Sequence, residues 1–188
     1  MKKIIKKIVM TLLLTGFSFS AFAMPAQILL IRHGEKPDVG SELSPQGWLR
    51  AKALPNMFER SEFLKFGLPV AFYAMSPQKK QGSVRAIQTL SFAAEKLKLP
   101  INKRFTRDEV SGLVRDIQEN PQYNGKMVVI CWEHKVLIDI AHTFGVKKYL
   151  DWPSEQYDRV WSLTYGSDQK TIQFEDLPEK VLPTDSQN

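Results

Sequence analysis

The sequence predicts one three-layer α/β/α domain, in which helices cover both faces of a mainly parallel sheet. Short apolar runs alternate with amphipathic stretches along the chain, and polar residues follow several of the apolar runs directly. Repeated strand–helix units of this kind are typical of such a sheet. Removal of a predicted leader of 23 residues from the 188-residue chain leaves 165, a length suited to one domain rather than two.

The first 23 residues have the pattern of a secretory signal peptide. Four lysines within the first seven positions precede an apolar run from Ile8 to Phe19, and Ala21 and Ala23 supply small residues for cleavage. This run is shorter than the roughly 20 apolar residues that cross a membrane. We therefore expect cleavage after Ala23, a periplasmic or secreted bacterial protein, and no stable membrane association once the leader is removed.

The charge of the chain argues against nucleic-acid binding. The formal net charge is +6, but four of the 26 basic residues belong to the leader, so the remainder carries an excess of only +2. The single cysteine, Cys131, has no internal partner for a disulfide and follows an apolar run. We expect it to be a small buried hydrophobic residue.

The first strand–helix unit is predicted between residues 27 and 54. Gln27–Ile31 is a continuous apolar run that indicates a buried strand. Ser44 and Pro45 are typical of the N-cap and first turn of a helix, which Pro55 then ends or kinks.

Three further units follow the first. A strand at Val70–Met75 precedes a polar loop and a helix capped by Ser83, in which apolar residues recur at helical spacing. The remaining predicted strands and helices, in order, are Ile101–Phe105, Glu109–Glu119, Lys126–Cys131 and Val136–Phe144. In such a sheet, ligands gather at the carboxyl ends of the strands.

A hairpin is predicted to close one edge of the sheet. Its strands are Arg159–Tyr165 and Lys170–Phe174, separated by a turn that contains Gly166. We expect the folded domain to span residues 24–177, and residues 178–188 to form a flexible tail because they have no packing pattern.

Three polar residues are expected to meet at the carboxyl ends of these strands. His33 follows the first strand, Arg85 opens the helix after the second, and His134 follows the strand Lys126–Cys131. An arginine pairs with two phosphate oxygens at once, and a neutral imidazole offers a nucleophilic nitrogen near neutral pH. The set therefore indicates phosphoryl transfer.

Four segments carry recognisable motifs in a fixed order. They are Leu30–Glu35 with Arg-His-Gly, Leu43–Ala51 with Leu-Ser-Pro-Gln-Gly, Ser83–Thr89 with Ser-Val-Arg-Ala-Ile-Gln-Thr, and Val128–His134. Together they resemble the motifs of the histidine phosphatase superfamily, which has a phosphoglycerate mutase-like fold. The resemblance implies a phosphomonoesterase without metal or other cofactor, acting on a small phosphate ester such as a sugar phosphate. It implies that His33 is the nucleophile, that Arg32 and Arg85 bind the phosphoryl group, and that His134 both binds that group and assists catalysis.

The proton donor has two candidates. Glu109 resembles the acid of mutase-like members, and we favour it. Glu133, the other candidate, directly precedes His134. Consecutive residues at a strand end tend to point to opposite sides, which makes it harder for Glu133 and His134 to face the same ligand. Other departures from the family pattern are Lys135, which replaces a common glycine, and the loop Pro77–Gly82, which carries Lys79 and Lys80. No long insertion is present to form a lid, so we expect an open pocket.

Three alternatives remain open. A phosphomutase would use the same phosphohistidine, although the expected export argues against a cytosolic substrate. A metallohydrolase would use the imidazole and carboxylate groups of His33, Glu35, Glu133 and His134. A protein of the same fold that binds phosphate without turnover is the third.

Overall fold

The computed structural model describes residues 24–80 and 82–186, so the predicted leader lies outside the described residues. Within these ranges, one sheet contains six strands in the order β3-β2-β4-β1-β5-β6. The strands are β1 (Gln27–Arg32), β2 (Pro69–Ala74), β3 (Ile101–Asn102), β4 (Met127–Trp132), β5 (Arg159–Tyr165) and β6 (Ile172–Pro178). The α-helices are α1 (Pro45–Ala53), α2 (Arg85–Leu97), α3 (Val110–Gln118) and α4 (His134–Phe144).

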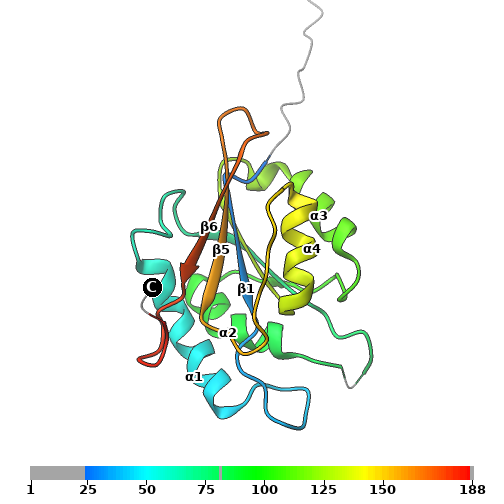
Figure 1. Ribbon diagram of the computed structural model, residues 1–188, viewed down its shortest axis with the longest axis vertical. Coiled ribbons are helices and arrows are strands. Elements are labelled where there is room, and N and C mark those ends of the chain that lie inside the picture. Colours follow the sequence, from blue (N-terminus) through cyan, green and yellow to red (C-terminus); the bar gives the residue numbers. More distant parts are fainter. Residues whose placement is uncertain (1–23, 81, 187–188) are drawn as a thin grey trace, which may run out of the picture.

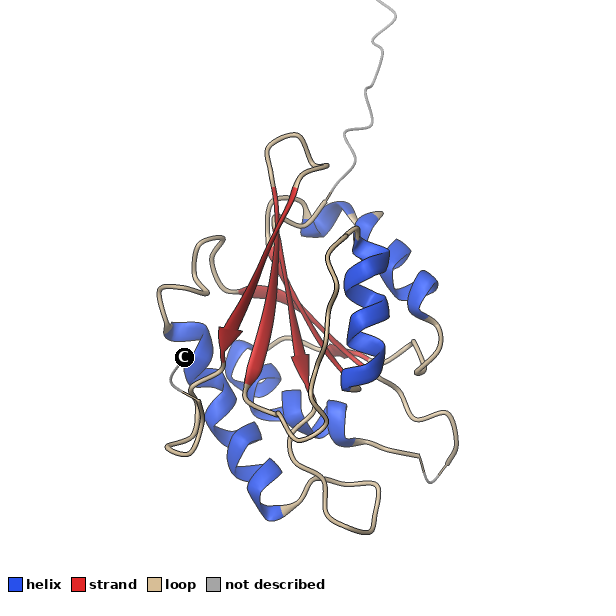
Figure 2. Cartoon of the chain, in the orientation of Figure 1, coloured by secondary structure: helices blue, strands red, loops and turns tan. Residues whose placement is uncertain are grey.

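Helices cover both faces of this sheet. The helices α1 and α2 pack against each other, as do α3 and α4, and Figures 1 and 2 show the two pairs on opposite sides of the strands. The strands β1 to β4 run parallel, whereas β5 is antiparallel to β1 and β6 is antiparallel to β5. The predicted three-layer fold with a mainly parallel sheet is confirmed.

The two central strands, β1 and β4, form the middle of the core. Every residue of both strands is buried, as expected for parallel strands that are covered on both faces. Their register places Arg32 beside Trp132, so both strands end at the same level. Residues 33 and 133–134 therefore emerge next to each other at one rim of the sheet.

The start and end of α1 follow from its sequence. The Ser44 hydroxyl accepts a hydrogen bond of 3.1 Å from the backbone N–H of Gly47, and Pro45 occupies the first turn. Pro55 lies in the 3-10 turn Leu54–Glu59, which follows α1 directly. A proline lacks the N–H that an α-helical hydrogen bond needs, so the α-helix ends there and a 3-10 helix follows.

The end of the chain differs from the flexible tail expected at residues 178–188. The strand β6 reaches Pro178, and within the described part of the tail Glu179 and Asp185 are buried. Their carboxylates lie 2.5 and 2.8 Å from the guanidinium of Arg50, which is itself buried on α1. Buried charges are retained when a partner compensates their desolvation. This pairing orders a segment that has no apolar pattern of its own.

The single cysteine lies on β4 and is fully buried, as the sequence predicts. Burial raises the pKa of the Cys131 thiol well above its usual value, which leaves it protonated and unreactive. Among the helices of residues 24–80 and 82–186, none has the length and apolar character needed to cross a membrane.

Candidate active site

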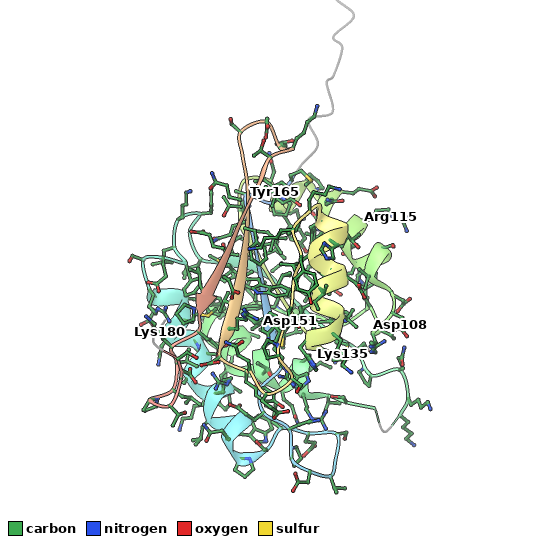
Figure 3. All side chains as sticks on the ribbon, viewed as in Figure 1. Asp108, Arg115, Lys135, Asp151, Tyr165 and Lys180 are labelled. Atoms are coloured by element: carbon green, nitrogen blue, oxygen red, sulfur yellow. The ribbon has the colours of Figure 1, made fainter. Side chains whose placement is uncertain are left out.

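The rim at the carboxyl ends of β1 and β4 carries the residues that the sequence singles out. His33 is the first residue after β1, His134 is the first residue of α4, and Arg85 is the first residue of α2. Figure 3 shows Lys135, the next residue after His134, at the lower end of α4. The N-termini of two helices thus reach this rim, and helix N-termini favour bound anions.

His33 is a buried, neutral imidazole. Only 4% of its surface is exposed, and its Nδ1 lies 2.8 Å from the carbonyl oxygen of Gly34. Because a carbonyl only accepts, Nδ1 carries the proton and Nε2 keeps its lone pair. Burial is the main cause of a pKa lowered to about 4, and the positive charges of Arg32, Arg85 and His134 act in the same direction. These four residues therefore share one electrostatic environment.

The loop that holds His33 is fixed by close backbone packing. A Cβ atom added to Gly47 would lie 2.5 Å from the carbonyl oxygen of Glu35, a distance that forces the backbone to move. The N–H of Gly34 donates a 2.8 Å hydrogen bond to the hydroxyl of Thr89 on α2. The loop that follows β1 is thereby held against both α1 and α2.

The guanidinium of Arg32 is anchored at one nitrogen, whereas another of its nitrogens is buried without a partner in the described part of the chain. Its Nη1 donates to the carbonyl oxygens of Ser154 at 2.5 Å and Gln156 at 3.0 Å. Its Nε is buried and has no hydrogen-bond partner in the described part of the chain. Burial lowers the pKa of this guanidinium. A buried donor without a partner costs about 1–3 kcal/mol, so the site suits an anion that accepts from it.

His134 shows the same feature as Arg32. Its Nδ1 is buried and lacks a partner among residues 24–80 and 82–186. Its pKa is lowered, first by burial and then by the charge of Arg32. Arg85 is held by backbone oxygens instead, because its Nε donates a 2.9 Å hydrogen bond to the carbonyl of Glu42. In the described residues, Arg32 and His134 thus each have a buried nitrogen without a partner, and both of them and Arg85 lie close enough to His33 for their charges to lower its pKa.

A cavity of about 510 Å³ opens beside His33. Its walls carry apolar, polar, cationic and acidic side chains, and its lining residues are His33, Met75, Ser76, Pro77, Gln78, Lys79, Gly82, Ser83, Arg85, Arg107 and Glu133. The loop that the sequence marks by Lys79 and Lys80 therefore forms one wall. A second cavity of about 550 Å³ shares Arg85 and is lined by Glu35, Tyr157 and other polar residues. A small ligand therefore has room beside His33.

The structure places the two candidate acids differently. Glu109 is exposed at the N-cap of α3, and its carboxylate accepts 2.7 Å hydrogen bonds from the N–H and the hydroxyl of Thr106. These bonds lower its pKa, and Glu109 does not line the cavity beside His33. Glu133 does line it and accepts a 2.5 Å hydrogen bond from Nε of Arg107. Glu133 is thus the acid that lies at the cavity.

Two residues at this rim have no counterpart among the expected site residues. Arg107 lies in the loop between β3 and α3 and bonds both Glu133 and Asp108. Tyr157 lies before β5, and its ring packs against the guanidinium of Arg32 at 3.7 Å. Neither belongs to a motif with recognisable spacing. An aromatic or basic residue in a loop gives no sequence signal of this kind.

The carboxylates proposed as metal ligands are engaged elsewhere. Glu35 pairs with Arg50 at 2.7 Å, and Glu133 pairs with Arg107 at 2.5 Å. In the described ranges, no three histidine, cysteine or acidic side chains gather closely enough to hold a metal ion. The four residues named for a metallohydrolase are therefore not arranged as one ligand set.

Comparisons with known proteins identify the fold. No family model and no curated protein matches the sequence. Among solved structures, the protein histidine phosphatase SixA complexed with tungstate is 16% identical, with a TM-score of 0.54, over 81% of this chain and 97% of that one. A mycobacterial glucosyl-3-phosphoglycerate phosphatase is 13% identical, with a TM-score of 0.52, over 81% and 97%. The phosphoglycerate mutase of Bacillus anthracis is 13% identical, with a TM-score of 0.51, over 82% and 93%. The fold is therefore phosphoglycerate mutase-like.

Proposed function

We propose that this chain is a histidine phosphatase, a phosphomonoesterase that works without metal through a phosphohistidine on His33. The observation that carries the proposal is the state of His33 beside the cavity. Its Nδ1 is bonded to the Gly34 carbonyl and its pKa lies near 4, so Nε2 is a free nucleophile at neutral pH. The charges of Arg32, Arg85 and His134 lie close enough to lower its pKa.

The phosphoryl group is held by Arg32, Arg85 and His134. Nε of Arg32 and Nδ1 of His134, which have no partner within residues 24–80 and 82–186, donate to equatorial oxygens, and the charge of Arg85 adds to the attraction. Such groups stabilise charge that builds on phosphorus ligands in the transition state. Anion binding also removes the cost of leaving both nitrogens unsatisfied.

The reaction proceeds in two balanced steps. In the first, Nε2 of His33 forms a bond to phosphorus, the bond from phosphorus to the ester oxygen breaks, and the alcohol oxygen takes a proton. In the second, a water oxygen forms a bond to phosphorus and loses a proton, and the bond from phosphorus to Nε2 breaks, which releases phosphate and free His33. Glu133 is the carboxyl group at the cavity, so we assign it the delivery of the first proton and the removal of the second.

The proposed substrate is a small phosphate ester, such as a sugar phosphate, that the enzyme meets outside the cytoplasm. The leader pattern of residues 1–23 supports export. The open cavity of about 510 Å³ fits a small leaving group. One structural neighbour is named as a phosphatase of a glucosylated phosphoglycerate. The excess of only +2 charges over residues 24–188 gives no support for a nucleic-acid partner.

A panel of phosphate esters tests this function. Wild type and His33→Ala are assayed on sugar phosphates, glycerol phosphates, an aryl phosphate and a phosphoramidate, each with and without chelator. We expect hydrolysis that survives chelation and falls at least about 10³-fold in His33→Ala. Activity that vanishes on chelation, or that persists in the variant, overturns the proposal. Phosphoryl transfer to an added alcohol in place of phosphate release identifies a mutase.

A further inference from the structure

Arg32 is enclosed by a segment that lies more than 120 positions later in the chain. Its Nη1 donates to the carbonyl oxygens of Ser154 and Gln156, and the Tyr157 ring covers its guanidinium at 3.7 Å. The sheet explains this approach, because β5 pairs antiparallel with β1 and Ile31 is opposite Val160. The start of β5 therefore lies beside the end of β1, where Arg32 stands.

The enclosing segment is itself tied to the core. Nε1 of Trp152 donates a 2.9 Å hydrogen bond to the carbonyl oxygen of Gln156, the same oxygen that accepts from Arg32. Trp152 is buried and packs on Trp161 of β5 with 4.7 Å between ring centroids. The Gln156 carbonyl that holds Arg32 is thus tied to a buried residue that packs against β5.

Tyr157 lies close to two residues of the proposed phosphoryl site, Arg32 and His33. Its ring lies against Arg32, and its centroid is 6.3 Å from that of His33. Tyr157 also lines the second cavity, which shares Arg85. The ring covers one face of the guanidinium, the carbonyls hold its Nη1 end, and the Nε edge remains without a partner in the described part of the chain.

We propose that Tyr157 is a positioning residue, whose ring holds Arg32 in the orientation that presents Nε to a phosphate oxygen. The inference rests on the proposed function, because it assigns a role within the same site. The ring acts through Arg32 and needs no contact with the substrate. An aromatic face suffices for this role, since a guanidinium stacks on it by cation–π attraction. The hydroxyl group of Tyr157 is dispensable.

A double-mutant cycle with inorganic phosphate tests the role without relying on turnover. The dissociation constant of phosphate is measured by calorimetry for wild type, Tyr157→Leu, Arg32→Ala and the double variant. We expect Tyr157→Leu to weaken binding about tenfold, Tyr157→Phe to stay within about twofold, and the double variant to equal Arg32→Ala. Tyr149→Leu is the matched control, because Tyr149 is 89% exposed.

The outcomes separate this inference from the proposed function. Phosphate binding that is unaffected by Arg32→Ala contradicts the proposed site itself. Two results overturn the positioning role alone. One is phosphate binding that depends on Arg32 but not on Tyr157. The other is a loss of phosphate affinity on Tyr157→Leu that is equal with Arg32 present and with Arg32→Ala. Thermal unfolding is recorded for each variant, and Tyr157→Met replaces Tyr157→Leu if the latter does not fold. For a positioning role we also expect kcat/KM to be lower in Tyr157→Leu than in wild type and close to the wild-type value in Tyr157→Phe.

Discussion

The backbone N–H of His33 donates a 3.1 Å hydrogen bond to the carbonyl oxygen of Trp132. This bond continues the parallel pairing of β1 and β4 by one residue and aligns the two chain segments as they leave the sheet. The residues that follow Trp132 are Glu133 and His134, so the second histidine and the acid are brought to the first histidine by the sheet register. The site is a product of strand pairing.

The first prediction concerns the protonation of His33. Burial lowers its pKa to about 4, so it stays neutral as pH falls from 8 to 5. Imidazole nitrogen shifts measured by NMR are practical because the chain has three histidines. We expect the signal lost in His33→Ala to keep its Nδ1-protonated neutral form down to about pH 5. A midpoint near 6.5 contradicts the described environment.

The second prediction separates the two acids. Glu133→Gln should lower kcat for an alkyl phosphate about 10²- to 10⁴-fold, the usual contribution of a proton donor, and much less for an activated aryl phosphate. Glu109→Gln should stay within about twofold on both, because the Glu109 carboxylate is bonded to Thr106 and does not line the cavity. Steady-state kinetics on the two esters provide the check. A larger loss in Glu109→Gln reverses the assignment.

The third prediction concerns the buried carboxyl group of Glu179. Burial, among three carboxylates around Arg50, raises its pKa to about 7 from a reference of 4.5. The folded state thus favours the protonated form, so its stabilising contribution is complete below pH 4.5 and is lost as pH rises through 7. Glu179→Gln mimics the neutral form.

We therefore compare the free energy of unfolding of Glu179→Gln with that of wild type. We expect the value for the variant minus the value for wild type to rise between pH 5 and pH 8. A gain on the order of 2 kcal/mol follows from the size of the shift. Urea unfolding at both pH values measures it. A constant or falling difference shows that Glu179 is ionised throughout this range.

The fourth prediction concerns Gly47 on α1. An alanine in a helix usually stabilises it by about 0.5–1 kcal/mol relative to glycine. Here the added Cβ would lie 2.5 Å from the carbonyl oxygen of Glu35, so we expect a loss of about 1–3 kcal/mol and a shifted His33 loop. Chemical denaturation and phosphatase assays check both effects. Gln46→Ala, at an exposed neighbouring position, should be neutral in both.

The sequence predicts this fold well because its signals are local. Buried apolar runs such as Gln27–Ile31 specify central strands, and Ser44 with Pro45 specifies a helix start. The grouping of His33, Arg85 and His134 follows from the same reasoning, since the carboxyl ends of neighbouring parallel strands share a rim.

The features that the sequence does not predict depend on contacts between distant residues. Glu109 has the appearance of a site acid, but its carboxylate is exposed and bonds to the N–H and hydroxyl of Thr106 in the preceding loop. From the sequence alone, Glu179 and Asp185 belong to a solvated tail. In the structure, both carboxylates pair with the guanidinium of Arg50. Tyr157 meets Arg32 only because β5 pairs with β1.

The most direct test of the account is the capture of a phosphorylated enzyme. Wild type is mixed with its best ester from the panel, quenched rapidly at alkaline pH, at which phosphohistidine survives, and digested for mass spectrometry. We predict phosphate on the imidazole of His33, at Nε2, and none in His33→Ala. A rapidly turning-over enzyme that carries no phosphate, or carries it on another residue, contradicts the account.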